Sequence, residues 1–162
     1  MPSVLDAEEL ARQANDERVA AGLRDYFPSP YTVDDALRFI DTVLAKPEPI
    51  THWLIEIEGR PAGIMSLFKG EDVYRYNAEI GYWLGYQYWG RGYGSAAIAL
   101  AVEYAWSRLQ VTRVYAEVFS TNPASRRVLE KNGFVHEYTL PGVVVKGGEV
   151  CDAVCLGVRR SG

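Results

Sequence analysis

The sequence has few of the side chains that build disulfides or metal sites. It contains two cysteines and two histidines among 162 residues. Cys151 and Cys155 lie four positions apart in a run that reads as one strand, which would separate them by about 13 Å, too far for a disulfide. His52 and His136 each flank an expected strand and have no ligand-type partner nearby in the sequence. We therefore expect buried thiols, a reducing cytoplasmic location and no metal site.

Long apolar runs and an excess of basic residues are also absent. The longest apolar stretches fall far short of the roughly 20 residues that cross a membrane. The N-terminal residues 1–6 have neither the basic nor the apolar region of a secretory signal. The net charge is −4, and the Lys and Arg residues are scattered, which gives no basic footprint for nucleic acid. We therefore expect no nucleic-acid partner and no membrane partner.

The remaining composition is that of a globular protein with one core. Hydrophobic residues make up 48% and charged residues 23% of the chain, and the length suits a single domain over residues 1–162. A helical start followed by alternating helix and strand signals predicts an α/β fold, or α+β in some schemes. The expected helices cover 6–21, a segment that begins at Thr32, 92–109 and 123–131, and the expected strands cover 52–57, 62–68, 75–84, 113–119, 134–138 and 150–158.

The most informative segment is the glycine-rich run from Trp89 to Ala96. Gly90, Gly92 and Gly94 follow a strong strand and open a long helix. Such glycines allow tight turning and expose backbone N–H groups, which together with a helix N-terminus can bind an anion. From these residues alone, a plain connecting turn explains the run equally well. The glycine spacing differs from that of a dinucleotide-binding fold, and the Gly-Lys-Ser/Thr of a nucleotide P-loop is absent.

Three segments together resemble a known family. The segments 78–84, 88–94 and 122–134 are similar to the GNAT superfamily of acetyltransferases, and within it to the RimJ/RimL branch. This resemblance covers nearly the whole chain. It implies a GNAT-like mixed, mostly antiparallel central sheet flanked by about four helices, with acetyl-CoA as co-substrate. It also implies the following cofactor-binding residues: Tyr82, Trp83, Leu84, Trp89, Gly90, Arg91, Gly92, Tyr93, Gly94, Ser95, Asn122 and Ser125.

The chain departs from the family pattern at three places. Trp89 stands where the superfamily loop usually opens with Gln or Arg. Leu129 stands where many members carry a tyrosine that acts as general acid, so this role is vacant or reassigned. Only residues 1–5 precede the first expected helix, so the first strand of the family is missing or shortened. The last departure concerns the edge of the sheet and leaves the cofactor site unaffected.

Acetyl transfer to an amine requires a base, donors for the developing oxyanion and a proton for the leaving thiolate. Glu79 is the first candidate for the base, because it lies in an apolar strand where burial would make it more basic. Its alternative is a structural carboxylate paired with an arginine or with backbone groups. Glu117, in a second apolar strand, is the rival base. Ser125 is the candidate proton donor near sulfur, although it and Asn122 also suit a helix N-terminus.

The acceptor is the least specified part of the site. The aromatic loop 27–31, with Phe27 and Tyr31, lies where the resembled family covers the amine substrate, and its alternative is a plain connector between helices. The acceptor is therefore expected to be a small-molecule amine or a protein N-terminus. A homodimer is implied by the resemblance only. The competing function is a CoA-binding sensor or degenerate module without catalysis, which the missing tyrosine would explain.

Overall fold

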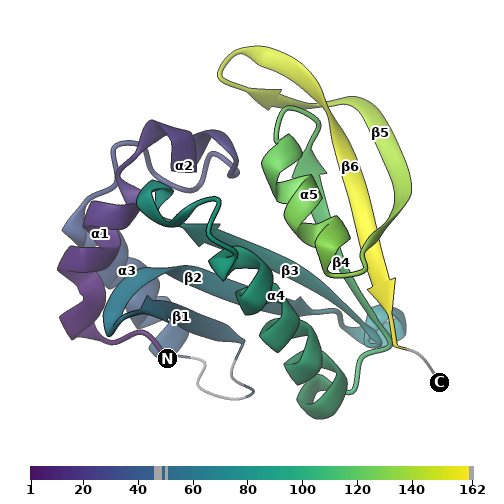
Figure 1. The fold of residues 1–162 in the computed structure, drawn as a ribbon, viewed down its shortest axis with the longest axis horizontal. Helices are drawn as coiled ribbons and strands as arrows, with labels where there is room; N and C mark the ends of the chain where they lie inside the picture. Colours follow the sequence, from purple (N-terminus) through teal and green to yellow (C-terminus); the bar gives the residue numbers. More distant parts are fainter. Residues whose placement is uncertain (46–48, 50, 161–162) are drawn as a thin grey trace. The chain divides into compact units, whose positions relative to one another are not determined.

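The computed structural model describes residues 1–45, 49 and 51–160 (Figure 1). These residues form two compact units, each described separately. Unit 1 contains residues 1–66 and 82–93, and unit 2 contains 67–81 and the chain from Gly94 onward.

Unit 1 begins with helices rather than with a strand. After a short 3-10 turn, Val4–Asp6, come α1 (Ala7–Ala14), α2 (Glu17–Ala21) and α3 (Val33–Leu44). The expected helix over 6–21 is therefore two helices. Asn15 leaves the helical conformation, and the Asp16 side chain accepts a hydrogen bond from the Arg18 N–H and caps α2. Thr32 caps α3 as expected, in a reciprocal arrangement with Asp35.

The core of unit 1 lies where α1 and α3 pack together, side by side in Figure 1. The two helices contribute small and aliphatic side chains at helical spacing, so one face of each is buried. Strand β1 (His52–Ile57) pairs antiparallel with β2 (Arg60–Lys69) through a turn in which Glu58 and Gly59 have positive φ. The core cluster consists of Ala7, Leu10, Ala11, Ala14, Tyr31, Ala36, Ile40 and Ile64.

Unit 2 holds the strands of the second half of the sheet and two helices. Strand β3 (Asn77–Leu84) runs parallel to β4 (Arg113–Phe119), and β4 pairs antiparallel with β6 (Glu149–Arg159). Helix α4 (Tyr93–Tyr104) continues into a π-helical turn over Ala105–Leu109, and α5 spans Pro123–Lys131. Buried side chains from both helices, from the strands and from Phe134, which immediately precedes β5, form the core. They include Ile98, Val114, Leu129 and Leu156.

Strand β5 (Val135–Lys146) and β6 form the long hairpin drawn in green and yellow in Figure 1. Gly147 and Gly148 form the turn of this hairpin, and both glycines have positive φ. Strand β5 is longer than the expected segment 134–138, because register shifts between His136 and Tyr138 and between Leu140 and Val144 absorb extra residues. Such bulges let pairing resume after residues that break the strand pattern.

The expected fold class is confirmed. The six strands hydrogen-bond in the order β1-β2-β3-β4-β6-β5, and the sheet is mixed and mostly antiparallel. Five α-helices occur among the described residues, rather than four, because the first predicted helix is split. The described residues before α1 form no strand. Both cysteines are free and buried, as expected.

Candidate active site

The glycine loop adopts the open conformation that its sequence predicts. In unit 1, Gly90 and Gly92 have φ values of 73° and 85°, in the left-handed region that favours glycine. An added Cβ at either position would meet no atom within 4 Å, so the space above both residues is open. The indole Nε1 of Trp89 donates to the carbonyl oxygen of Leu84 at 2.7 Å, which ties the start of the loop to the end of β3.

Gly94 differs from Gly90 and Gly92 in its backbone conformation. It lies in the first turn of α4 without a positive φ, and an added Cβ would be 3.8 Å from Val128 Cγ1, an ordinary contact. A positive φ therefore requires glycine at position 92 but not at position 94. That a bound pyrophosphate requires the bare backbone at Gly94 stays a prediction.

Ser95 is held by a residue that the sequence did not single out. Its hydroxyl accepts a hydrogen bond from Asn132 Nδ2 at 2.9 Å, and the same amide donates to the Val128 carbonyl at 2.9 Å. Asn132 follows α5 and thereby links the end of that helix to the first turn of α4, both within unit 2. The Asn132-Gly133 pair signals a helix end in the sequence, but its contact with α4 depends on tertiary packing.

The loop suits an anionic ligand. Two open glycines are followed directly by the N-terminus of the 12-residue helix α4, where unpaired N–H groups and the positive end of the helix dipole occur together. The side chain of Arg91 is exposed within this loop. These features meet the chemical requirement of a pyrophosphate group.

An aromatic and cationic stack lies just before the loop in unit 1. The rings of Tyr86 and Trp89 are 5.2 Å apart, and Arg18 Cζ lies 3.4 Å from the centroid of the Tyr86 ring. Asp16 binds the Arg18 guanidinium through Nε at 2.8 Å and Nη2 at 2.6 Å. The start of α2 is thus fastened to the segment that leads into the glycine loop.

Glu79 lies on the more open face of β3. Ala78 and Ile80 are buried, whereas Glu79 is half-buried, so the burial expected for Glu79 is only partial. Glu117, the rival base, is exposed on β4, and the burial argument does not apply to it. Between them, Tyr115 is the Cα partner of Glu79 in the β3–β4 ladder.

Helix α5 places Asn122 and Ser125 in a capping arrangement. The Asn122 Oδ1 accepts a hydrogen bond from the Ser125 N–H at 3.1 Å, which makes Asn122 the N-cap. Ser125 is half-buried. Leu129 is fully buried in the core of unit 2, so this position supplies no polar group for proton transfer.

The aromatic loop of unit 1 is partly a core element. Tyr31 is buried, and burial raises the pKa of its phenol to about 12. Phe27 is half-buried and contacts both Tyr31, at a centroid distance of 4.8 Å, and Trp83, at 5.7 Å. This cluster attaches the loop to the last part of β3, and only Phe27 and Trp83 have partly exposed rings.

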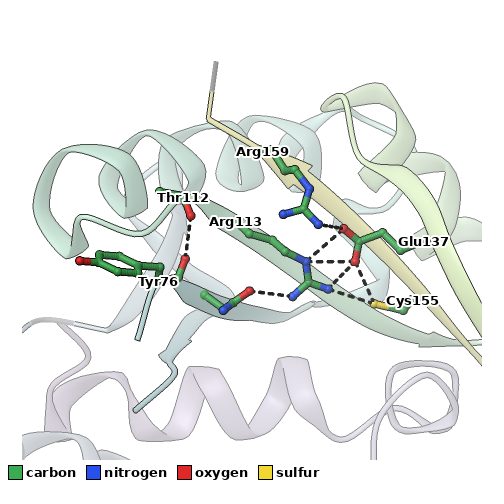
Figure 2. Close-up of polar contacts among 7 residues, drawn as sticks. Tyr76, Thr112, Arg113, Glu137, Cys155 and Arg159 are labelled. Carbon is green, nitrogen blue, oxygen red and sulfur yellow. Dashed lines mark hydrogen bonds and ion pairs between the residues drawn. The ribbon is translucent and has the colours of Figure 1, made fainter. Parts of the chain in front are cut away.

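A polar network that the sequence did not predict crosses the sheet of unit 2 (Figure 2). Arg113 Nε donates to both carboxylate oxygens of Glu137 at 3.0 Å, and its Nη2 also binds that carboxylate. Arg113 Nη1 donates to Asn77 Oδ1 at 3.1 Å, and Arg159 Nη2 donates to Glu137 Oε1 at 3.2 Å. The network therefore connects β3, β4, β5 and β6.

This network should make the free energy of unfolding depend on pH in the acidic range. Its hydrogen bond from Arg113 lowers the pKa of Glu137 despite partial burial. A lowered pKa in the folded state means that the stabilisation is complete above about pH 4.3, the usual value, and is lost as the pH falls through the folded value. Glu137→Gln should lower the free energy of unfolding by about 2 kcal/mol at neutral pH and by less near pH 3, measured by urea unfolding.

The matched control for this prediction is Glu149→Gln. Glu149 is an exposed carboxylate at the start of β6. We expect its substitution to change stability by less than about 0.5 kcal/mol at either pH. Equal losses in the two variants, or a Glu137→Gln loss that does not shrink in acid, would contradict the proposed contribution of the ion pair.

No group of three or more His, Cys, Asp or Glu side chains in the described part of the chain is arranged to hold a metal ion. Within residues 1–45, 49 and 51–160, no helix combines the length and apolar character needed to cross a bilayer.

Known proteins share both the sequence pattern and the fold. The family model described as acetyltransferase (GNAT) domain matches residues 2–135. The chain is 39% identical over 75 residues to the uncharacterized N-acetyltransferase YoaA of Bacillus subtilis, covering 46% of this chain and 42% of YoaA. It is 24% identical over 144 residues to spermidine N(1)-acetyltransferase of Escherichia coli K12, covering 85% and 77%.

The matches to several curated relatives, YoaA among them, span less than half of those proteins' length. Among solved structures, Mycobacterium smegmatis RimJ in complex with CoA-disulfide superposes with a TM-score of 0.85 at 21% identity. That alignment covers 98% of this chain and 79% of RimJ. At this identity the likeness establishes the fold alone.

Proposed function

The chain belongs to the acetyltransferase (GNAT) family, and we propose that it transfers an acetyl group from acetyl-CoA to a primary amine. The observation that carries this proposal is the glycine loop, with its open Gly90 and Gly92 directly before the N-terminus of α4. We further propose that residues 1–162 act as one domain, since the family model spans parts of both units.

The proposed cofactor-binding residues follow the geometry of each unit. Backbone N–H groups from Arg91 to Ser95 would hold the pyrophosphate, and Asn132 would keep Ser95 in place. Backbone groups of Tyr82, Trp83 and Leu84 would bind the pantetheine arm, and the Trp89 indole fixes the Leu84 carbonyl. Acetyl-CoA supplies the activated acetyl group when bound.

Glu79 is the proposed base for the acceptor ammonium. Its half-buried position, between the buried Ala78 and Ile80 on β3, supports this role better than the exposed position of Glu117 on β4 does. Ser125 is the proposed hydrogen-bond donor to the leaving sulfur, because Leu129 is apolar and buried.

The acceptor is proposed to be either a protein N-terminal α-amine, as in the RimJ/RimL branch, or a small amine. The fold shared with RimJ supports the first, and the similarity to a spermidine acetyltransferase supports the second. Phe27 and Trp83, whose rings are in contact, would form part of the acceptor wall. A homodimer is proposed only from the family resemblance, and light scattering would test it.

The test is a thiol-release assay with acetyl-CoA and a panel of acceptors. The panel should contain spermidine and other polyamines, amino acids, aminoglycosides and short peptides with free or blocked N-termini. We expect acceptor-dependent CoA release for one class and none for blocked amines. If acetyl-CoA binds by calorimetry but no amine releases CoA, the sensor function replaces the enzyme, and if neither occurs the cofactor assignment fails.

Substituting Ser125 tests the proposed hydrogen bond to sulfur. A free thiol has a pKa of about 8.5, so the CoA thiolate leaves without full protonation and a donor should help only moderately. We expect Ser125→Ala to lower kcat roughly 10-fold, about 1.4 kcal/mol in the transition state, with little change in acceptor KM.

Asn122→Ala serves as the control for the cap itself. It removes the side chain that accepts from the Ser125 N–H but keeps the Ser125 hydroxyl. We expect a loss of about 1 kcal/mol in stability from this variant. An unchanged kcat in Ser125→Ala would show that the serine has only a structural role in the first turn of α5. The leaving thiolate would then be protonated by water.

A further inference from the structure

One aromatic residue stands directly beside the proposed base. The parallel ladder between β3 and β4 pairs Asn77 with Arg113, Ala78 with Val114 and Glu79 with Tyr115. Both strands continue beyond this last pair, to Leu84 and Phe119. Glu79 and Tyr115 are therefore neighbours across the ladder, where adjacent strands are about 4.8 Å apart, and their side chains lie on the same face of the sheet.

Tyr115 is in turn held from the side of the polar network. Arg113 Cζ lies 4.2 Å from the centroid of the Tyr115 ring, within the range of a cation–π contact. Glu137 and Asn77 fix the Arg113 guanidinium through the hydrogen bonds shown above (Figure 2). Arg113 and Tyr115 are two residues apart on β4, so Arg113 packs on the Tyr115 ring and holds it next to Glu79.

We propose that Tyr115 is a positioning residue for the Glu79 carboxylate, and that the Arg113–Glu137 pair holds the Tyr115 ring in the place that this role requires. The proposal rests on the proposed function, in which Glu79 is the base. Its chemical content is that a half-buried phenol beside Glu79 can donate a hydrogen bond to the carboxylate and thereby hold it in one position.

The charges around Tyr115 agree with a position of its phenol close to the Glu79 carboxylate. Burial raises the pKa of the Tyr115 phenol, and the negative charge of Glu79 is the next largest cause, so the hydroxyl keeps its proton. Arg113 opposes this shift, whereas Cys155 and Glu117 add to it weakly. The titratable and charged groups that surround this face within unit 2 are Glu79, Arg113, Glu117, Glu137, Tyr138, Cys155 and Arg159.

A second tyrosine on this sheet provides an internal control. The pKa of Tyr138 is raised to about 12, first by its hydrogen bond with Cys155, then by burial and by the charges of Cys155 and Glu117. Glu79 is not among these causes. Removing the Glu79 charge should therefore change the titration of Tyr115 and leave that of Tyr138 unchanged.

The experiment follows the tyrosine Cζ signals of the full chain by NMR with 13C-labelled tyrosine, in the parent and in Glu79→Gln. Tyr115→Phe assigns the signal. We expect the pKa of Tyr115 to fall in Glu79→Gln while that of Tyr138 stays constant. An unchanged Tyr115 pKa overturns the proposal, whatever the activity of the variant.

A kinetic arm tests the consequence for the base. Tyr115→Phe keeps the ring on Arg113 but removes the hydroxyl, so we expect kcat/KM to fall about 10-fold and its rise with pH to move to higher pH. A profile that superimposes on the parent overturns the positioning role. If Glu79→Gln itself keeps a normal kcat, the base assignment fails, and the NMR arm still decides whether Tyr115 contacts Glu79.

Discussion

Replacing Glu79 with glutamine should lower kcat by about 100-fold or more while the affinity for acetyl-CoA stays the same. Glutamine has nearly the shape of glutamate, so the half-buried site on β3 keeps its packing. It cannot accept the ammonium proton, so the increase of the rate with pH should flatten. Stopped assays of kcat across pH, together with calorimetry for acetyl-CoA, separate the loss of the base from a loss of binding.

Glu117→Gln is the matched control for this result. Glu117 lies on the neighbouring strand two residues after Tyr115, so it carries the same chemistry within the same sheet but is exposed. We expect its kcat to stay within about threefold of the parent, because Glu117 is exposed to water on β4 and lies outside the half-buried position proposed for the base. A large loss in Glu117→Gln with a normal Glu79→Gln would move the base to β4.

The second large effect is expected in the glycine loop. Gly92→Ala should weaken acetyl-CoA binding by at least about 10-fold, because alanine at a φ of 85° is strained by about 1–2 kcal/mol and the loop would relax away from its open form. Its methyl group would also enter the open space above Gly92, where no protein atom lies within 4 Å. Isothermal calorimetry with CoA and acetyl-CoA measures the effect.

Gly148→Ala separates strain from binding. Gly148 has a φ of 82° and also has nothing within 4 Å of an added Cβ, but it lies in the β5–β6 turn. The two variants should lose similar stability in urea unfolding, and only Gly92→Ala should lose affinity for the cofactor. Equal affinities in both variants and the parent would exclude the loop as the pyrophosphate site.

Periodic and capping signals predicted much of the fold because they are local. All six strands overlap the expected segments, although β3 begins at Asn77 rather than at residue 75 and β5 extends to Lys146. Thr32 and Asn122 cap helices as their residue types suggest. Asn15 and Asp16 carry the same kind of local capping signal, and they divide one predicted helix into two. Local chemistry thus fixes most boundaries, and an interior Asn-Asp pair is a reason to divide a helix.

Contacts across strands could not be predicted in the same way. Arg113 and Glu137 are 24 residues apart, and nothing near either residue indicates its partner. Gly94 likewise looked equivalent to Gly92 in the sequence, although only Gly92 has a positive φ. The position of Tyr115 beside Glu79 depends on the register of a parallel pair, which is set by the packing of the sheet as a whole.

The interrupted strand β5 has a consequence for contacts between molecules. It lies at the end of the strand order, and Val143 and Val145 are exposed along it. A long straight edge with such side chains would invite another chain to add a strand and begin open-ended stacking. The two bulges, the second of which contains Pro141, divide the edge into short bent pieces whose N–H and C=O groups do not line up for a second strand. The irregularities of β5 therefore disfavour the pairing of a second chain with this edge, and with it aggregation through strand addition.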